Sequence, residues 1–197
     1  MSEDDRRKWN QRYAAGAYAT RPVPSAWLRQ WLPDAPVGRA LDVACGLGRN
    51  ARFMAQAGFA VDAVDISSEA LSRAAGLAAA EGVEVCWREC DLEQGLPEDC
   101  TGYQLIVMVR YVNAALLADL CSRLAPGGYL VVEEHLRTVE QVAGPENPRF
   151  RVASGELERA LAGLQVLGAE ESVVTDPDGA RVALARVAAR RSGKAEL

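Results

Sequence analysis

Short apolar runs alternate along most of the chain with stretches in which apolar residues recur at helical spacing, beginning near residue 38. The pattern predicts strands over 40–44, 59–64, 83–87, 103–109 and 129–133, and helices over 49–57, 68–81 and 113–124. Such alternation is typical of a doubly wound α/β fold, a mostly parallel sheet with helices on both faces. Because residues 105–109 are all apolar, we expect their strand to lie near the centre of the sheet.

The pattern changes towards the end of the chain. A helix expected over 156–163 is followed by two strand-like runs, 165–174 and 180–188, and the turn sequence DPDG at 176–179 joins them. This predicts a closing antiparallel hairpin, which a plain dinucleotide-binding fold lacks. We expect residues 190–197, which are small and polar, to form a frayed tail.

Length and composition indicate one globular domain. The chain has 197 residues, 49% of them apolar and 25% charged. We divide it into an N-terminal helical lid segment (1–36), a Rossmann-like core (37–189) and the tail (190–197). A net charge of −5 disfavours nucleic acid as a partner. No apolar run approaches membrane-spanning length, and the first residues lead into no signal core, so we expect a cytoplasmic protein that binds no membrane.

Five cysteines occur without paired metal-binding spacing, so we expect reduced thiols and no metal site. We expect the protein to be a monomer or a weak homodimer.

The segment LDVACGLGRN at residues 41–50 carries the most specific chemistry. A glycine turn that leads from a strand into a helix exposes backbone amides, and Asp42 adds a negative charge close by. We expect that charge to face the ligand, which should then be cationic, as the sulfonium of S-adenosylmethionine is. The pyrophosphate of a dinucleotide would be repelled.

Two more acidic residues follow the next strands. Asp65 follows the second strand and Asp91 the third, so both are expected at the carboxyl edge where open α/β sheets bind ligands. We expect Asp65 to accept from ribose hydroxyls, and Asp91 or the Leu92 amide to lie near adenine. The loose GxGxxG/A pattern of 46–51 is also satisfied by dinucleotide-binding sites, so an NAD(P)-dependent oxidoreductase stays open, as does a non-catalytic binding module.

Four short motifs resemble those of class I S-adenosylmethionine-dependent methyltransferases. They are LDVACGLG at 41–48, DIS at 65–67, CDL at 90–92 and LAPGG at 124–128. The resemblance implies a seven-stranded sheet in the order 3-2-1-4-5-7-6. WNQRY at 9–13 and VRYVN at 109–113 are similar to the small bacterial branch that includes tellurite-resistance and thiopurine-type enzymes. The resemblance to the methyltransferases implies that the methyl donor is bound by Asp42, Ala44, Cys45, Gly46, Gly48, Asn50, Asp65, Ile66, Asp91, Leu92 and Val109.

The acceptor is expected near the ends of the fourth and fifth strands, where Arg110, Tyr111, Asn113, Glu133, Glu134 and His135 fall. His135 is a candidate base, or a packing residue. Arg110 could hold an anionic acceptor, or pair with a neighbouring glutamate. Tyr111 could line the cleft, or pack against it. The missing Asn/Asp-Pro-Pro-Tyr/Phe motif disfavours exocyclic amines, and we expect a small-molecule acceptor such as a thiol, selenium or tellurium species.

Aromatic residues are concentrated in the first 31 positions. Trp9 and Tyr13 would share a helix face, and with Tyr18 they predict a lid that covers the donor. Trp27 and Trp31 could belong to the lid or to a docked helix. Arg149 and Phe150, in the proline-punctuated loop 144–151, are candidate specificity residues or plain loop residues.

Overall fold

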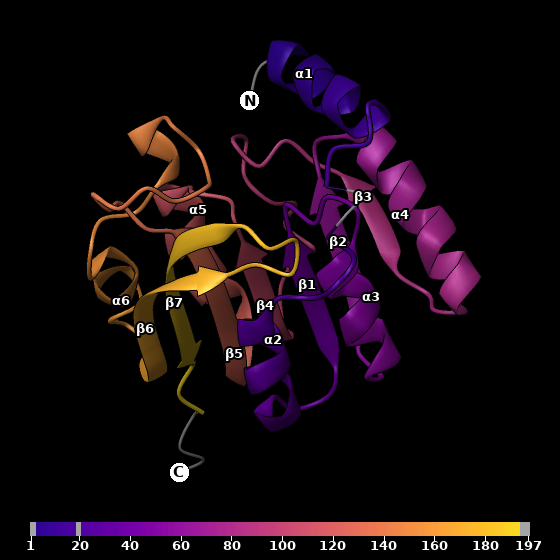
Figure 1. Ribbon diagram of the computed structural model, residues 1–197. Helices are drawn as coiled ribbons and strands as arrows, with labels where there is room; N and C mark the ends of the chain where they lie inside the picture. Colours follow the sequence, from indigo (N-terminus) through magenta and orange to yellow (C-terminus); the bar gives the residue numbers. More distant parts are fainter. Residues whose placement is uncertain (1–2, 19–20, 194–197) are drawn as a thin grey trace.

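The computed structural model describes residues 3–18 and 21–193 and contains a twisted seven-stranded sheet (Figure 1). Its strand order, β3-β2-β1-β4-β5-β7-β6, confirms the expected order. Strands β1 to β5 run parallel, and β7 is antiparallel to both β5 and β6. The strands are β1 (Arg39–Val43), β2 (Ala60–Asp65), β3 (Cys86–Glu89), β4 (Tyr103–Val109), β5 (Leu124–His135), β6 (Gln165–Thr175) and β7 (Arg181–Arg190).

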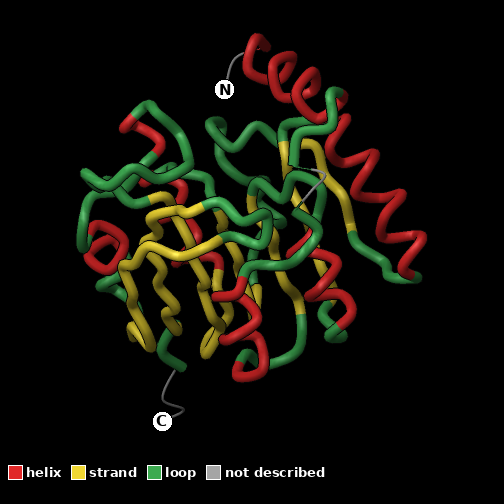
Figure 2. The backbone as a smooth tube through the Cα atoms, in the orientation of Figure 1, coloured by secondary structure: helices red, strands yellow, loops and turns green. Residues whose placement is uncertain are grey.

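Helices cover both faces of this sheet (Figure 2). Helices α2 (Ala26–Trp31), α3 (Arg49–Gln56) and α4 (Ser68–Glu81) enclose one apolar core, in which Leu28, Met54 and Leu71 pack with Val107. Helices α5 (Ala114–Arg123) and α6 (Glu156–Ala160) enclose the other. Successive side chains of a strand point to opposite faces, so β4 supplies both cores and is buried along most of its length, as its apolar run predicts.

Helix α1 (Glu3–Ala14) lies beyond the sheet beside the amino-terminal end of α4 (Figure 1). Ser67 caps α4 by accepting from the Ala70 N–H, and Gly82 ends the helix with φ +68°. The two short 3-10 helices are η1 (Leu32–Asp34) and η2 (Pro148–Phe150). No helix within residues 3–18 and 21–193 is long and apolar enough to span a membrane.

Several elements differ in length from the sequence prediction. Strand β3 begins at Cys86 instead of residue 83, and α6 ends at Ala160. Strand β5 begins at Leu124, which pairs with Tyr103 before a register shift, so the expected turn at 126–128 is part of an irregular strand. Arg190 is still part of β7 and pairs with β5, and the Arg191 N–H donates to the Gly128 carbonyl oxygen at 2.9 Å. Ordered structure therefore extends past residue 189. The expected tail residues 194–197 lie outside the described part.

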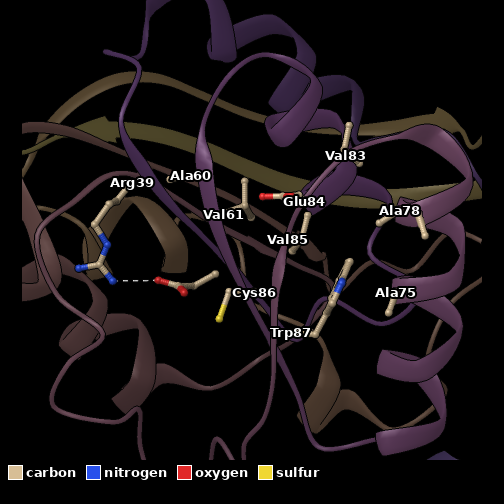
Figure 3. Close-up of a pocket in the computed structure, with 12 residues that line it drawn as sticks. Arg39, Ala60, Val61, Ala75, Ala78, Val83, Glu84, Val85, Cys86 and Trp87 are labelled. Carbon is tan, nitrogen blue, oxygen red and sulfur yellow. Dashed lines mark hydrogen bonds and ion pairs between the residues drawn. The ribbon is translucent and has the colours of Figure 1, made fainter.

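The late start of β3 leaves a cavity of about 610 Å³ beside the first residues of β1 and β2 (Figure 3). Arg39, paired with Asp62 at 2.9 Å, lies on one side, and Trp87 lies on the other. This cavity is at the amino ends of the strands. Ligands of open α/β sheets bind at the opposite, carboxyl edge.

Candidate cofactor and acceptor site

The loop between β1 and α3 is a tight left-handed turn. Ala44, Gly46 and Gly48 all have positive φ, of 54°, 54° and 70°. A Cβ on Gly46 would lie 2.7 Å from the Tyr13 hydroxyl oxygen, and one on Gly48 would lie 2.3 Å from the Trp87 ring. Both the backbone conformation and the close neighbours therefore favour glycine at positions 46 and 48.

Asp65 joins the end of β2 to this glycine loop. Its Oδ2 accepts the Gly46 N–H at 2.8 Å, and its Oδ1 accepts the Ser67 N–H at 2.9 Å. Burial raises the pKa of its carboxyl group, and the amide hydrogen bonds lower it. A carboxylate has about four lone-pair sites, so Asp65 can still accept from ribose hydroxyls.

The segment that follows β3 lies next to Asp65. The Cys90 N–H donates to the Asp65 carbonyl oxygen at 2.9 Å, and Asp91 Oδ1 accepts the Glu93 N–H at 3.0 Å. Leu92 and Ile66 are buried. The structure thus brings together the two acidic segments that the sequence placed in one crevice.

Asp42 does not face this crevice, so the expectation about its charge is wrong. Its side chain is 1% exposed, and its Oδ2 accepts the Ala51 N–H at 2.9 Å. Within the described structure, Oδ1 has no hydrogen-bond partner. Leu41 and Val43 face the α5 side of the sheet, so Asp42 between them points to the opposite side, under the first turn of α3. Burial raises its pKa to about 7.

Asn50 and Cys45 are also buried. Asn50 Oδ1 accepts the Ser25 N–H at 3.0 Å, so this side chain anchors the N-terminal segment. Burial, followed by nearby Asp65 and Asp42, raises the pKa of the Cys45 thiol. Asn50 therefore contributes to the site indirectly, by holding the segment at Ser25 in place.

Helix α1 packs against α4, and its residue Tyr13 lies over the glycine loop. Asn10 Oδ1 accepts the Ser67 hydroxyl at 2.7 Å, which docks α1 on the start of α4. The Tyr13 ring is buried over Gly46, and its centroid lies 5.9 Å from those of Trp9 and Tyr18. Trp9 and Tyr18 are more exposed than Tyr13 and stack against it.

Trp27 and Trp31 belong to a docked helix, one of the two alternatives considered for them. Their rings meet edge-on with centroids 5.7 Å apart. Both pack against Gly168 of β6, where a Cβ would lie 2.5 Å from Trp31 and 3.5 Å from Trp27. They stabilise the sheet at a distance from the glycine loop.

Val109 is buried at the end of β4, and the next two residues turn back across the carboxyl edge. Tyr111 is half-buried. Burial is the largest cause that raises its pKa to about 12, and Glu93, Asp91 and Asp65 add to it electrostatically. Tyr111 packs against the apolar cluster that contains Leu92, which follows β3.

The Arg110 guanidinium forms ion pairs with two carboxylates. Its guanidinium donates to Glu133 Oε1 at 3.3 Å and to both carboxylate oxygens of Asp176, at 2.9 and 3.2 Å. Its pairing with Glu133 is one of the two alternatives that the sequence left open. Asp176 lies in the β6–β7 turn, and the sequence marked it only as a turn residue. It could not be predicted as a partner of Arg110, because only the folded sheet brings that turn beside the end of β4.

His135 is held neutral beside Arg110. Nη1 of Arg110 is 3.3 Å from Nε2 of His135, which therefore accepts. Burial first, then Arg110 and Arg151, lower the pKa of His135 to about 3. Nδ1 lies against Gly144 and has no hydrogen-bond partner among the described residues. This geometry gives no support to His135 as a general base.

A strap formed by residues 21–25 crosses the acceptor side. Arg21 pairs with Asp178 at 2.6 Å, and the Ser25 hydroxyl donates to Glu133 Oε2 at 3.0 Å. Arg49 Nη1 donates to the Val23 carbonyl oxygen at 3.2 Å. Sequence reasoning missed these contacts, since they join segments that are more than 20 residues apart.

The loop beyond β5 is anchored by arginine. Arg151 donates to the carbonyl oxygens of Pro145 and Leu136, at 2.8 and 3.0 Å. Phe150 and Arg149 are exposed, and nothing in the geometry links them to the cofactor cleft. Across the described ranges, no group of three or more His, Cys, Asp or Glu side chains is arranged to hold a metal ion.

Part of the chain is similar in sequence to known methyltransferases. A methyltransferase domain family matches residues 40–128. The Ubiquinone biosynthesis O-methyltransferase of Caulobacter sp. (strain K31) is 34% identical over 110 residues, which are 53% of this chain and 44% of that protein. The chain thus spans less than half the length of this curated relative.

Two solved structures have the same fold. TehB from Haemophilus influenzae superposes with a TM-score of 0.74 at 20% identity, over 93% of this chain and 67% of that one. Magnesium protoporphyrin IX methyltransferase (ChlM) from Synechocystis PCC 6803 with bound SAH gives 0.62 at 17% identity, over 96% and 86%. The chain therefore has the Rossmann-like fold of these two proteins.

The chain is therefore similar to class I S-adenosylmethionine-dependent methyltransferases in its fold and over residues 40–128. S-adenosylmethionine is the cofactor of these methyltransferases. The residues at the expected cofactor site of this chain fit it. The Gly46 loop and the Asp65 carboxylate meet at the carboxyl edge of the sheet, where open α/β sheets bind ligands. The dinucleotide-dependent and non-catalytic alternatives are not favoured.

Proposed function

We propose that this protein transfers a methyl group from S-adenosylmethionine to a small-molecule acceptor with a soft nucleophile, such as a thiol, selenium or tellurium species. The observation that carries the proposal is the junction at Asp65. One carboxylate binds the Gly46 amide, and the same residue's carbonyl binds the Cys90 amide. Three strand ends thereby converge under Tyr13, which a cofactor with adenosyl and amino-acid ends requires.

The bound cofactor would supply an activated methyl group. The residues of this chain would then align the acceptor and exclude water, which are the main contributions that such a displacement needs. Asp65 would orient the ribose, Tyr13 would cover the cradle, and the strap at 21–25 would close the acceptor side.

The contact of His135 Nε2 with Arg110 supports a soft acceptor. An oxygen or protonated amine needs a base, but His135 Nε2 already accepts from Arg110, and Glu133 is paired with Arg110 and Ser25. A nucleophile that ionises easily needs little proton abstraction. A hydroxyl acceptor is the second candidate, because the relative from Caulobacter is named as an O-methyltransferase.

An acceptor panel tests the proposal. Purified protein with methyl-labelled S-adenosylmethionine would be offered thiols, selenite, tellurite, phenols, amines and carboxylates, and labelled product would be measured. We expect labelling of a sulfur, selenium or tellurium acceptor that is lost in Asp65→Ala. Labelling of phenols alone would favour the second candidate. Binding of NAD(H) or NADP(H) without binding of S-adenosylhomocysteine would overturn the proposal.

A further inference from the structure

The turn after β4 has a strained backbone. Arg110 has φ +62°, a left-handed conformation that residues with a Cβ rarely adopt. Such strain persists only where the surrounding structure holds it, and it is concentrated at functional sites. Here the strained residue directly precedes Tyr111, which packs against the cluster that contains Leu92, at the carboxyl edge where the cofactor is expected.

Two consecutive glutamates of β5 hold this turn from opposite faces of the sheet. The Glu133 carbonyl oxygen accepts the Arg110 N–H at 2.8 Å, and its carboxylate binds the Arg110 guanidinium. Glu134 Oε1 accepts the Tyr111 N–H at 3.0 Å. Strands β4 and β5 are neighbours in the sheet, so both glutamates reach across to the same turn (Figure 1).

Glu134 is buried in an unusual way for a glutamate. It is 1% exposed, and its Oε2 has no hydrogen-bond partner in the part of the chain that the structure describes. Burial raises the pKa of this carboxyl group well above its ordinary value. A neutral carboxyl group can accept the Tyr111 N–H through one oxygen, as a glutamine amide would. The hydrogen bond from the Tyr111 N–H does not require a negative charge on Glu134.

We propose that Glu134 is a positioning residue for methyl transfer, which fixes the Arg110–Tyr111 turn so that Tyr111 keeps its place beside the bound cofactor. The assignment rests on the proposed function. It also implies that Glu134 acts as a hydrogen-bond acceptor and not through charge.

A double-mutant cycle tests this assignment. Binding of S-adenosylhomocysteine would be measured by calorimetry for wild type, Glu134→Gln, Glu134→Leu, Tyr111→Ala and the double variant E134L/Y111A. We expect E134Q to bind within about twofold of wild type and E134L to bind about tenfold more weakly. In the Tyr111→Ala background, E134L should cause no further loss of affinity. The side chain that Glu134 is proposed to hold in place is already absent there.

A matched control separates positioning from general stability. Val132→Ala removes buried volume two residues earlier on the same face of β5, and it should lower the melting temperature without changing the affinity for S-adenosylhomocysteine. If E134L does not fold, E134Q alone still tests whether Glu134 acts as an uncharged hydrogen-bond acceptor. Loss of S-adenosylhomocysteine binding by E134Q would overturn that role. Failure of wild type to bind would overturn the proposed function together with this assignment. Tight binding by wild type and by E134L would overturn the assignment alone, as would additive losses in the cycle.

Discussion

Nη1 of Arg110 lies 3.3 Å from Nε2 of His135, so the single histidine of this chain faces a cation. Its pKa falls to about 3, below the ordinary value in an unfolded chain of about 6.5. Between these values the unfolded chain binds a proton that the folded protein does not. The contribution of His135 to stability is therefore present above about pH 6.5 and is lost as the pH falls.

We accordingly expect wild type to lose about 1 kcal/mol more unfolding free energy than His135→Gln between pH 7.5 and pH 5.5. Urea unfolding of both proteins at the two pH values measures this difference. We also expect His135→Ala to keep its affinity for S-adenosylhomocysteine. An inflection of kcat between pH 6 and 8 that disappears in His135→Gln would return His135 to the role of a base.

Asp42 should show the opposite pH dependence. Burial raises its pKa to about 7 in the folded protein, so the folded state binds a proton that the unfolded chain has released between about pH 4 and 7. Stability from this group is present at low pH and lost as the pH rises. Asp42→Asn should therefore be more stable than wild type by roughly 1 to 3 kcal/mol at pH 8, with a smaller difference at pH 5. Chemical denaturation at both pH values tests this, and lower stability of the variant at pH 8 would contradict it.

Asp65→Ala should weaken the binding of S-adenosylhomocysteine by about 1 to 3 kcal/mol, because it removes the ribose acceptor and the partner of the Gly46 amide. Calorimetry measures the affinity, and a melting curve shows whether the variant is folded. Asp62→Ala is the matched control on the same strand: it loses contacts to Arg39 and Tyr103 and should keep the affinity. Equal affinities of wild type and folded Asp65→Ala would refute the ribose assignment.

Gly46→Ala should lower both stability and affinity for S-adenosylhomocysteine. The new methyl group would stand 2.7 Å from the Tyr13 hydroxyl oxygen, on a backbone with φ +54°. Tyr13→Phe removes that oxygen, so the double variant should recover about 1 kcal/mol of the lost unfolding free energy, measured by urea denaturation. No recovery would mean that the backbone strain alone explains the loss. Gly76→Ala, at a helix position with no atom within 4 Å, is the control.

The doubly wound α/β fold, its closing hairpin and the place of the cofactor edge could be predicted from the sequence, because apolar runs, glycine turns and the DPDG turn are local signals. The strand order came from the resemblance to methyltransferases, and the structure confirms it. The convergence of Gly46, Asp65 and Asp91 follows from the same logic, because parallel strands end at one edge. The extents of β3 and β5 did not follow, since pairing with neighbouring strands decides where a strand starts.

The directions and partners of the charged side chains were decided by tertiary structure alone. Asp42 looks like a ligand-facing carboxylate in sequence, yet strand alternation turns it under α3. Arg110 and His135 look available for an acceptor, yet Asp176, 66 residues from Arg110, pairs with the arginine. Burial, and then the same arginine, lower the pKa of His135. Sequence periodicity specifies which face a residue can reach. The electrostatic state of a buried group depends on neighbours that only the folded chain brings within a few ångströms.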